Sequence, residues 1–343
     1  MQVAVITGPT NLEWVEEPDP VSGPGEVLVR MTHTALSPGS NLHAWTTGSY
    51  GAAWKPGEKT APLYMGSGEI VGVGEDVDPA RVGQRVAFNG PGHQSLAVLP
   101  TALAHPVPDG VDPAAASLAY LSAWSVSALH LGEYAAAETV VVVGLGLVGA
   151  SAALVANAMG ARVLALDALP DRVERGRQLP LGLVAEGATA QDDPVVQAFL
   201  GAAGADLIID TTGSWHGFRT ALAFARDYSR IALMGIVREP PPPDLAAMLH
   251  ADLFGFPSPF HYQRIKVVGC GSDPGVLAEP MPRMATKGRN FAWVLEQMGR
   301  GRLDLAPLVT SRRPAGEIET VLRDLAAGDR SQVGIVFDWE GAA

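Results

Sequence analysis

The strongest pattern of apolar positions in the chain is the run TVVVV at residues 139–143, which closely spaced glycines follow at once. A stretch that is apolar at every position predicts a strand buried on both faces, as in a parallel sheet. Small and apolar residues then continue to Met159, and Gly160 is a helix stop. A second apolar run at residues 162–166 ends at Asp167. The whole stretch therefore predicts strand, glycine turn, helix and strand.

The glycines of the turn, which reads GLGLVG, have the spacing of a dinucleotide-binding loop. Gly144 is expected to make the tight turn, Gly146 to let the backbone approach a pyrophosphate, and Gly149 to let the helix pack closely on the strand. The first helical turn, with Leu147 and Val148, offers free N–H groups to phosphates. The alternative is a glycine-rich turn in an α/β domain that binds no ligand. Because an acidic residue follows roughly 20 residues on, the pattern favours dinucleotide binding.

Asp167, at the tip of the second predicted strand, bears on the choice of dinucleotide. A carboxylate there can accept hydrogen bonds from both ribose hydroxyls and would repel a 2′-phosphate. The sequence therefore favours NAD(H) over NADP(H). Arg172 lies nearby and could stack on adenine or soften that repulsion. Alternatively, Arg172 is a solvated helix residue.

The first third of the chain has a different pattern, in which short alternating runs are separated by glycine and proline. Strands are predicted at residues 2–7, 11–16, 26–36, 68–73, 84–88 and 94–99. Many short strands with turn signals between them predict a β-barrel-like domain, which should end near residues 108–110. An alanine-rich helix is expected next, over residues 113–131.

Strand and helix patterns alternate after the glycine turn. Further strands are predicted at residues 205–210, 230–234 and 264–269, and helices at residues 170–178, 194–200 and 215–226. This alternation predicts a doubly wound parallel sheet, whose ligands bind beyond the carboxyl ends of its strands.

The last part of the chain is predicted as a loop over residues 271–288, helices at 291–298 and 317–326 around a short segment at 303–309, and a strand at 332–337. A fragment of this size could not bury its own apolar face, so we expect it to rejoin the first domain. The cofactor would then lie in the cleft between domains. The expected domains are residues 1–118, 119–271 and 272–343.

Composition restricts the class of protein. The chain has 343 residues, of which 47% are hydrophobic and 17% charged, and its net charge is −12 without a basic cluster. Such a chain is long enough for two domains and disfavours nucleic acid and membranes as partners. The single cysteine, Cys270, excludes an intramolecular disulfide, and no signal peptide is expected at the start. We therefore expect a cytoplasmic enzyme with a small-molecule substrate.

The order of these elements resembles the medium-chain dehydrogenase/reductase superfamily over nearly the whole chain. The likeness is carried by PGEVLVR, VGQRVAF, GLGLVG, DTTG and PAGEIETVLRDL. It implies an α/β protein with a barrel-like (GroES-like) catalytic domain, a Rossmann domain, and hydride transfer to or from nicotinamide. Residues that match cofactor-lining positions of relatives are Ser122, Thr211, Gly213, Gly235 and Gly269. Relatives commonly pair through the last strand of the dinucleotide domain, so a homodimer is expected.

The zinc ligands of metal-dependent members are the main departure from the family pattern. Those members have a Cys-Gly-(Ser/Thr)-Asp-x-His segment where this chain reads PGSNLH, which puts Pro38 at the cysteine position. They have Gly-His-Glu where this chain reads SGE, which puts Gly68 at the histidine position, and the third ligand position is Leu118. A zinc site needs three protein ligands, and none remains. The four-cysteine structural site is impossible with one cysteine, so the resemblance implies a zinc-free member.

Ser40 and His43 match family positions that relay a proton from an alcohol to solvent. Ser40 could hydrogen-bond the reacting oxygen, and His43 could pass the proton on, because imidazole titrates near neutral pH. Alternatively, Ser40 caps a helix that begins near Asn41, and His43 is an ordinary surface residue. The SPGS segment also resembles zinc-free relatives of bacteriochlorophyllide dehydrogenase, which would suit secondary metabolism.

Without zinc, the carbonyl has to be polarised by hydrogen bonds or by a general acid. Tyr50 and Tyr64 are the preferred candidates, and His93 and Tyr120 are also considered. The tyrosines could instead be apolar walls of the pocket. Cys270 is expected to be a buried strand residue rather than a nucleophile.

The favoured function is a zinc-independent oxidoreductase that transfers a hydride between NAD(H) and an alcohol or ketone group of a moderately large metabolite. The first alternative is a C=C reductase of the quinone or enoyl kind, which needs no zinc but often prefers NADPH. The second alternative is a dinucleotide-binding sensor without catalysis.

Overall fold

The structure, a computed structural model, describes residues 1–50, 53–187, 190–202, 204–270 and 287–340. The chain divides into two compact units. Unit 1 comprises Met1–Tyr120 and Phe291–Ala343, and unit 2 comprises Leu121–Asn290. The expected domain boundary after residue 271, and most of the loop predicted there, lie outside the described residues.

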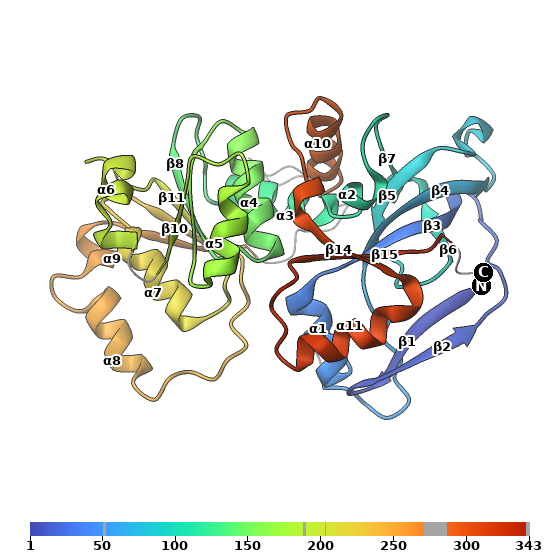
Figure 1. Ribbon diagram of the computed structural model, residues 1–343, viewed down its shortest axis with the longest axis horizontal. Coiled ribbons are helices and arrows are strands. Elements are labelled where there is room, and N and C mark those ends of the chain that lie inside the picture. The colour runs from blue at the N-terminus through green and yellow to red at the C-terminus, as the bar shows by residue number, and fades with distance from the viewer. Residues whose placement is uncertain (51–52, 188–189, 203, 271–286, 341–343) are drawn as a thin grey trace. The chain divides into compact units, whose positions relative to one another are not determined.

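Unit 2 contains a six-stranded parallel sheet (Figure 1). Its strands are β8 (Thr139–Val143), β9 (Arg162–Asp167), β10 (Leu183–Glu186), β11 (Leu207–Asp210), β12 (Arg230–Leu233) and β13 (Lys266–Gly269). In space their order is β10-β9-β8-β11-β12-β13. The order reverses between β8 and β11, which is the switch point where doubly wound sheets bind their ligands. The predicted doubly wound fold is therefore confirmed.

Helices cover both faces of this sheet. Val140, Val141 and Val142 point alternately to the two faces, and all three are fully buried. The helices are α3 (Ala119–Leu131), α4 (Leu147–Ala158), α5 (Pro170–Arg177), α6 (Pro194–Leu200), α7 (Trp215–Phe224), α8 (Leu245–Leu249), the π-helical turn η4 (His250–Phe254) and α9 (Pro259–Tyr262), with a 3₁₀ turn, η3, at Ala190–Asp192. The segments α8, η4 and α9 were not predicted, because each spans only four or five residues.

The sequence pattern also does not predict strand β10, and residues 205–210, which form β11, are the third strand that it predicts. β10 has only four residues, and its apolar pattern is too short to stand out. Its pairing with β9, where Val184 lies opposite Ala165, fixes it at the edge of the sheet. A tertiary contact therefore defines this strand.

Unit 1 contains a seven-stranded sheet and a separate hairpin. The sheet consists of β3 (Glu26–Leu36), β4 (Met65–Val73), β5 (Arg85–Asn89), β6 (Leu96–Pro100), β7 (His105–Pro106), β14 (Val309–Pro314) and β15 (Gly334–Asp338), and the hairpin of β1 (Gln2–Gly8) and β2 (Asn11–Glu16). β15 pairs with β3, so the last part of the chain completes a sheet that the first part begins. β14 was missed because its residues alternate between half-buried and exposed and never form an apolar run.

The helix predicted over residues 113–131 is divided in two. The helices that lie wholly or mostly in unit 1 are α1 (Pro38–Thr47), α2 (Pro113–Ala116), α10 (Lys287–Gly299) and α11 (Ile318–Ala326). Its 3₁₀ turns are η1 (Pro79–Arg81), η2 (Thr101–Leu103), η5 (Ala306–Leu308) and η6 (Ala315–Glu317). The Ser117 hydroxyl donates to the Ala114 carbonyl at 2.6 Å, and Leu118 N–H donates to the Ala115 carbonyl at 3.0 Å. Bonds to the third preceding residue tighten the chain and end α2 before α3 begins.

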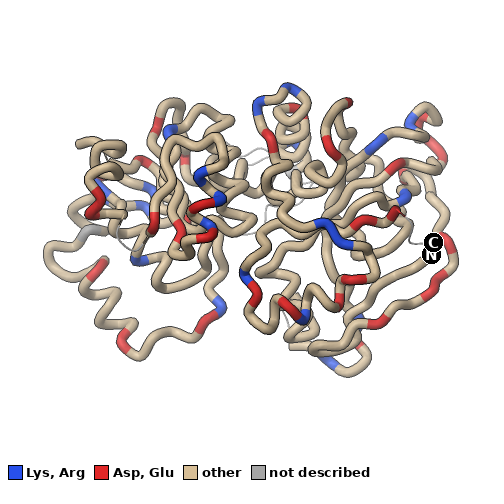
Figure 2. The backbone as a smooth tube through the Cα atoms, in the orientation of Figure 1, with Lys and Arg blue, Asp and Glu red and all other residues tan. Residues whose placement is uncertain are grey.

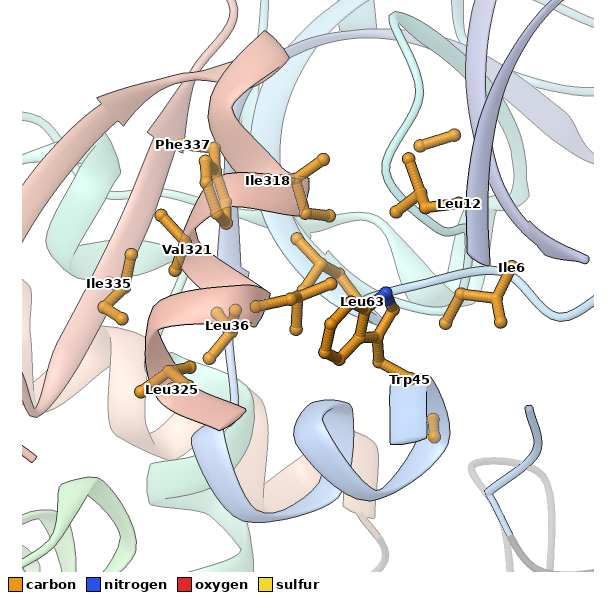
Figure 3. Packing of buried hydrophobic residues seen from close by; sticks show 13 residues of the cluster. Ile6, Leu12, Leu36, Trp45, Leu63, Ile318, Val321, Leu325, Ile335 and Phe337 are labelled. Carbon is orange, nitrogen blue, oxygen red and sulfur yellow. The ribbon is translucent and has the colours of Figure 1, made fainter. Parts of the chain in front are cut away.

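A hydrophobic core in unit 1 fixes the position of α1 (Figure 3). Trp45 of α1 packs in one buried cluster with Leu325 of α11 and Phe337 of β15. Trp45 is 3% exposed and Phe337 is fully buried. Burying such large apolar side chains is the main source of stability for this packing. The segment that carries Ser40 and His43 is therefore held by elements from the end of the chain.

Acidic and basic residues are interspersed along the backbone of each unit (Figure 2). Acidic residues outnumber basic ones, which gives the net charge of −12. No helix within the described ranges is both long and apolar enough to cross a membrane.

Candidate functional site

The glycine turn of unit 2 leads directly into α4. Gly144 has φ +95°, a conformation that favours glycine, and its N–H donates to the Leu166 carbonyl at 2.7 Å. Helix α4 begins at Leu147, after Gly146 in an extended conformation. A Cβ on Gly149 would lie 1.8 Å from the Gly144 carbonyl oxygen, so only glycine fits there. The turn therefore aims the free N–H groups of α4 at the switch point of the sheet.

Thr211 supports this turn from the neighbouring strand end. Its hydroxyl lies 3.0 Å from the Val143 carbonyl oxygen and 3.3 Å from that of Gly144. The hydroxyl hydrogen is therefore directed at the turn, and Thr211 positions the turn rather than pointing away from it.

The other strand ends gather at the same edge of the sheet. Gly213 has φ +61°, and a Cβ on Gly235 would lie 2.1 Å from Gly213 N, so the loops after β11 and β12 touch backbone to backbone. Gly269 ends β13 and has open space around it. The structure thus brings the predicted glycines to the carboxyl edge, where doubly wound sheets bind ligands.

Asp167 is held beside the glycine turn by two backbone donors. Its Oδ2 accepts from Leu145 N–H at 2.6 Å, and its Oδ1 accepts from Leu169 N–H at 2.9 Å. A carboxylate offers about four lone-pair sites, and because Arg172 also donates to Oδ2 at 3.5 Å, it is Oδ1 that can still accept another hydrogen bond. The carboxylate is only 7% exposed and its orientation is fixed.

Arg172 forms an ion pair with Asp167, with 3.5 Å between Nη1 and Oδ2. Its side chain is 22% exposed, and a Cβ on Gly146 would lie 3.8 Å from Nη1. The interpretation of Arg172 as a solvated helix residue is therefore wrong. Arg172 lies against the turn.

Ser122 lies in the interior of unit 2. It is fully buried on α3, and its hydroxyl shares a hydrogen bond of 2.8 Å with the hydroxyl of Ser151 on α4. The role of Ser122 beside the nicotinamide stays a prediction.

In unit 1, the three positions that would carry zinc ligands hold Pro38, Gly68 and Leu118. Pro38 is the first residue of α1, and Leu118 is 1% exposed. A Cβ on Gly68 would lie 2.3 Å from the Arg30 carbonyl oxygen on the paired strand, so the backbone leaves no room for any side chain. Among the described residues, no cluster of three His, Cys, Asp or Glu could hold a metal ion.

Helix α1 carries both members of the predicted proton relay. Ser40 and His43 stand three residues apart, which places them on one side of the helix. The alternative role of Ser40 as helix cap is wrong, because α1 begins at Pro38 and its N-cap position is Ser37. Both relay side chains are partly exposed, as access to a substrate requires.

Aromatic side chains of unit 1 form a row. The rings of Tyr50 and Tyr64 meet edge to face with centroids 5.8 Å apart, and those of Tyr64 and Tyr120 do the same at 5.7 Å. Burial raises the pKa of Tyr50 and the neighbouring Tyr64 raises it further, while hydrogen bonds from Asn41 and the Leu63 backbone oppose this shift. The Tyr50 phenol therefore stays protonated at neutral pH.

Asn41 is a residue of this region that the sequence did not single out. It is 2% exposed, and its amide Nδ2 donates to the Tyr50 hydroxyl oxygen at 2.7 Å. The only signal in the sequence is a polar residue on the inner side of a short helix.

His93 is a structural residue, which corrects its inclusion among the candidate acids. It is fully buried, its Nε2 lies 2.8 Å from the Ala315 carbonyl, and its Nδ1 lies 2.6 Å from the Thr34 hydroxyl. A carbonyl only accepts, so Nε2 carries the hydrogen and Nδ1 accepts from Thr34. Trp339 Nε1 donates to the same Thr34 oxygen at 3.1 Å. Burial lowers the pKa of His93 to about 4.

Cys270 follows β13 and is 5% exposed. Burial raises the pKa of its thiol to about 11, which keeps it protonated and poorly nucleophilic. This agrees with its interpretation as a buried residue.

Comparison with known proteins bears on unit 2 most directly. Residues 148–273 match a family described as zinc-binding dehydrogenase. The matched stretch does not include positions 38, 68 and 118, which correspond to the zinc-ligand positions of metal-dependent relatives.

Relatives match over nearly the full length. L-galactonate-5-dehydrogenase of Escherichia coli is 26% identical over 95% of both chains, and L-threonine 3-dehydrogenase of Streptomyces coelicolor is 26% identical over 95% of this chain and 96% of the relative.

Solved structures share the fold. Galactitol-1-phosphate dehydrogenase from Escherichia coli superimposes with a TM-score of 0.78 at 17% identity, over 98% of this chain and 100% of the other. Quinone oxidoreductase from Thermus thermophilus gives a TM-score of 0.71 at 23% identity, over 98% and 100%. In the order of its elements, its glycine turn and these full-length matches, the chain is similar to dehydrogenases of the medium-chain dehydrogenase/reductase superfamily.

Proposed function

We propose that this protein is an NAD(H)-dependent oxidoreductase that interconverts an alcohol and a ketone without zinc. The observation that carries the proposal is the Asp167 carboxylate, which two backbone N–H groups orient beside the glycine turn. Relatives with full-length matches are dehydrogenases of L-galactonate and L-threonine, both of which bear secondary alcohols. Asp167 favours NAD(H) as the cofactor, and the substrates of these relatives favour alcohol chemistry.

The residues of unit 2 fit a nicotinamide dinucleotide, which would supply the hydride donor or acceptor. The N–H groups at the start of α4 would hold the pyrophosphate. The free acceptor site on Asp167 Oδ1 would accept a hydrogen bond from a ribose hydroxyl, and the charge of Asp167 would repel a 2′-phosphate. Arg172 offsets part of that repulsion from 3.5 Å, so we expect a preference for NAD(H) rather than complete exclusion of NADP(H).

The residues of unit 1 do not fit a catalytic zinc. Pro38 and Leu118 have no metal-binding atom, and a histidine at Gly68 would collide with the Arg30 carbonyl. Polarisation of the substrate oxygen therefore falls to hydrogen-bond donors. Ser40 is the proposed contact for that oxygen, His43 the proposed carrier of the proton to solvent, and Tyr50 and Tyr64 the proposed polarising groups.

A C=C reductase is the second candidate function. It is favoured by the same lack of metal ligands, because an enolate can be stabilised by hydrogen bonds alone. The fold is also shared with a quinone oxidoreductase. A sensor without catalysis is the third candidate, and it would bind NAD(H) without turnover.

Nicotinamide absorbance on protein of measured metal content tests the proposal. L-threonine, 2,3-butanediol and cyclohexanol would be offered with NAD⁺, and cyclohexanone, cyclohex-2-enone and 9,10-phenanthrenequinone with NADH. We expect turnover of alcohols or cyclohexanone that a chelator does not inhibit. Turnover of only the enone or the quinone would establish the second candidate, and inhibition by chelator would refute the zinc-free mechanism.

Replacing His43 with alanine separates the first two candidates. Alcohol oxidation needs the relay, so its rate should fall on the order of ten- to a hundredfold. Reduction of an enone would be nearly unchanged. Equal rates of alcohol oxidation in the variant and the wild type would remove His43 from the mechanism.

We also propose a homodimer. Among the described strands, β13 is the last of its sheet and pairs only with β12, so no described strand covers its other edge. Pairing of two such strands about a twofold axis would close both edges.

A further inference from the structure

Three residues of unit 1 form a directed chain of hydrogen bonds. The backbone N–H of Ser37 donates to Asn41 Oδ1 at 2.6 Å, and Asn41 Nδ2 donates to Tyr50 Oη at 2.7 Å. Ser37 is 4% exposed and Asn41 is 2% exposed. Both bonds are short and shielded from water, so the chain is rigid.

The direction of this chain follows from its first member. A backbone N–H can only donate, so the Asn41 atom that faces it has to be the oxygen, and the amide group cannot be flipped. The NH₂ group then faces Tyr50, whose oxygen has to accept. The hydroxyl hydrogen of Tyr50 is therefore directed away from Asn41. The Leu63 backbone also donates to the Tyr50 oxygen, so the two hydrogen bonds that the described residues make to this hydroxyl both use its oxygen as the acceptor.

The ring of Tyr50 is fixed as firmly as its oxygen. It packs against the buried cluster that contains Leu36, Trp45 and Leu63, and the ring of Tyr64 meets it edge to face. Because its pKa is raised, the phenol keeps its hydrogen at every physiological pH. A fixed donor that does not ionise is suited to stabilising a developing negative charge on oxygen.

We propose that Tyr50 donates the hydrogen bond that polarises the substrate's carbonyl oxygen, and that Asn41 is the positioning residue that turns the Tyr50 hydrogen toward the substrate. The inference rests on the proposed oxidoreductase function and assigns a role within it. In the direction of reduction, the carbonyl oxygen gains negative charge as the hydride reaches the carbon, and the bond from Tyr50 strengthens. The proton that completes the alcohol arrives through Ser40 and His43, so Tyr50 keeps its own.

Three variants separate this role from a structural one. Tyr50→Phe removes the donor, and kcat for cyclohexanone or its alcohol should fall roughly a hundred- to a thousandfold with little change in KM. Asn41→Asp keeps the shape of the side chain and its hydrogen bond from Ser37 N–H. It replaces the NH₂ group that faces Tyr50 with a carboxylate oxygen, so the Tyr50 hydroxyl hydrogen turns toward residue 41 and away from the substrate. We expect kcat to fall nearly as far as in Tyr50→Phe.

Asn41→Leu is the decisive comparison. It removes both hydrogen bonds but leaves Tyr50 free to donate to the substrate, so kcat should stay within about tenfold of the wild type. If Asn41 had only a structural role, Asn41→Leu would be the more damaging change, because it loses more bonds than Asn41→Asp. That order of rates would overturn the proposal. Tyr134→Phe, which removes the hydroxyl that donates to the Met159 carbonyl in unit 2, is the matched control and should keep full activity.

An NMR measurement, which needs no catalytic turnover, tests the Asn41–Tyr50 pair separately from the proposed oxidoreductase function. In ¹⁵N–¹H spectra, the side-chain amide signal of Asn41, identified by its loss in Asn41→Leu, should shift when Tyr50 becomes phenylalanine. An unchanged signal would refute the Asn41–Tyr50 pair whatever the activity. A shifted signal in a protein that turns over no substrate would refute the oxidoreductase and, with it, the catalytic half of the inference.

Discussion

His93 is buried as a neutral imidazole with one fixed tautomer, and this makes the stability of unit 1 depend on pH. The unfolded chain takes up a proton near the ordinary histidine pKa of 6.5, whereas the folded protein does so only near pH 4. Its contribution to the free energy of unfolding is therefore complete above pH 6.5 and is lost as the pH falls toward 4. The loss is on the order of 3 kcal/mol.

Urea unfolding at pH values from about 7 to about 4 would measure this loss. His105, whose pKa burial lowers in the same way, adds to the slope, so the wild type is compared with His93→Gln. The variant should be less stable at neutral pH and lose less stability on acidification. Parallel curves for the two proteins would show that His93 is not the buried group responsible.

Asp167 should control the choice of cofactor. Replacing it with alanine would remove the proposed ribose contact and the proposed repulsion of a 2′-phosphate, so the ratio of NADH to NADPH affinity should fall by roughly tenfold or more. The ratio, measured by calorimetric titration, is insensitive to general damage to the glycine turn, since both cofactors use that turn. Arg172→Ala is the control and should not favour NADPH. An unchanged ratio in the Asp167 variant would contradict the proposed preference.

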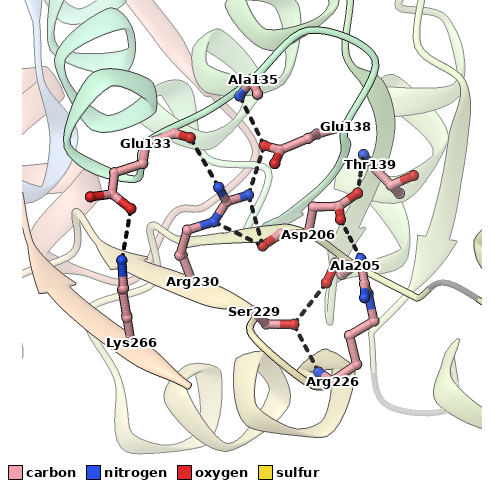
Figure 4. A network of polar contacts seen from close by, with 10 residues as sticks. All are labelled: Glu133, Ala135, Glu138, Thr139, Ala205, Asp206, Arg226, Ser229, Arg230 and Lys266. Carbon is pink, nitrogen blue, oxygen red and sulfur yellow. Dashed lines mark hydrogen bonds and ion pairs between the residues drawn. The ribbon is translucent and has the colours of Figure 1, made fainter. Parts of the chain in front are cut away.

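At the scale of elements, a polar network ties the amino ends of the strands of unit 2 together (Figure 4). Arg230 donates to the backbone carbonyls of Glu133 and Asp206 and pairs with the Glu138 carboxylate at 2.7 Å. Asp206 in turn accepts from Thr139 N–H at 2.9 Å. The Arg230 side chain is only 14% exposed, so these bonds are partly shielded from solvent.

Removing Arg230 should therefore destabilise the sheet. We expect Arg230→Met to lower the free energy of unfolding by about 2–3 kcal/mol, because the Glu138 carboxylate loses its ion-pair partner and the Glu133 and Asp206 carbonyls each lose one donor. Arg177→Met breaks an exposed ion pair with Glu174 and should cost less than about 1 kcal/mol. NADH affinity should be unchanged in both, since the network lies at the end of the strands opposite the glycine turn. Equal stability of the two variants in urea would contradict the expectation.

The elements that the sequence predicted well are those with a strong periodic pattern. β3 and β8 follow directly from alternation and from an unbroken β-branched run. β10 and β14 were missed because partner strands define them, and sequence periodicity does not record a partner. Asn41 was missed for a similar reason, since its role depends on a tyrosine nine residues away.

At the scale of the whole molecule, the open edge of β13 makes association testable. Lys266 N–H donates to the Ser229 carbonyl at 3.0 Å and Cys270 N–H to the Leu233 carbonyl at 2.9 Å, so these groups face β12. By the alternation of a strand, the N–H groups of Val267 and Gly269 face the open edge. Val267 is 37% exposed. A substitution there can remove an outward donor without breaking the pairing with β12.

We expect the wild type to sediment as a dimer and Val267→Pro to sediment as a monomer in sedimentation velocity. The Val267→Pro monomer should still be folded and unfold cooperatively on heating. Val268→Pro is the matched control, because it removes an inward donor and should impair folding itself. A wild-type protein that sediments as a monomer, or a variant that remains a dimer, would exclude β13 as the interface.

Gly68 has a consequence for attempts to redesign this chain. At position 68 the first carbon atom of any side chain already collides with the opposite strand. A designer who wishes to build a zinc enzyme on this scaffold therefore has to re-register or separate β3 and β4 first. At position 68 the spacing between the backbones of β3 and β4 excludes a side chain, and replacing a single amino acid does not change that spacing.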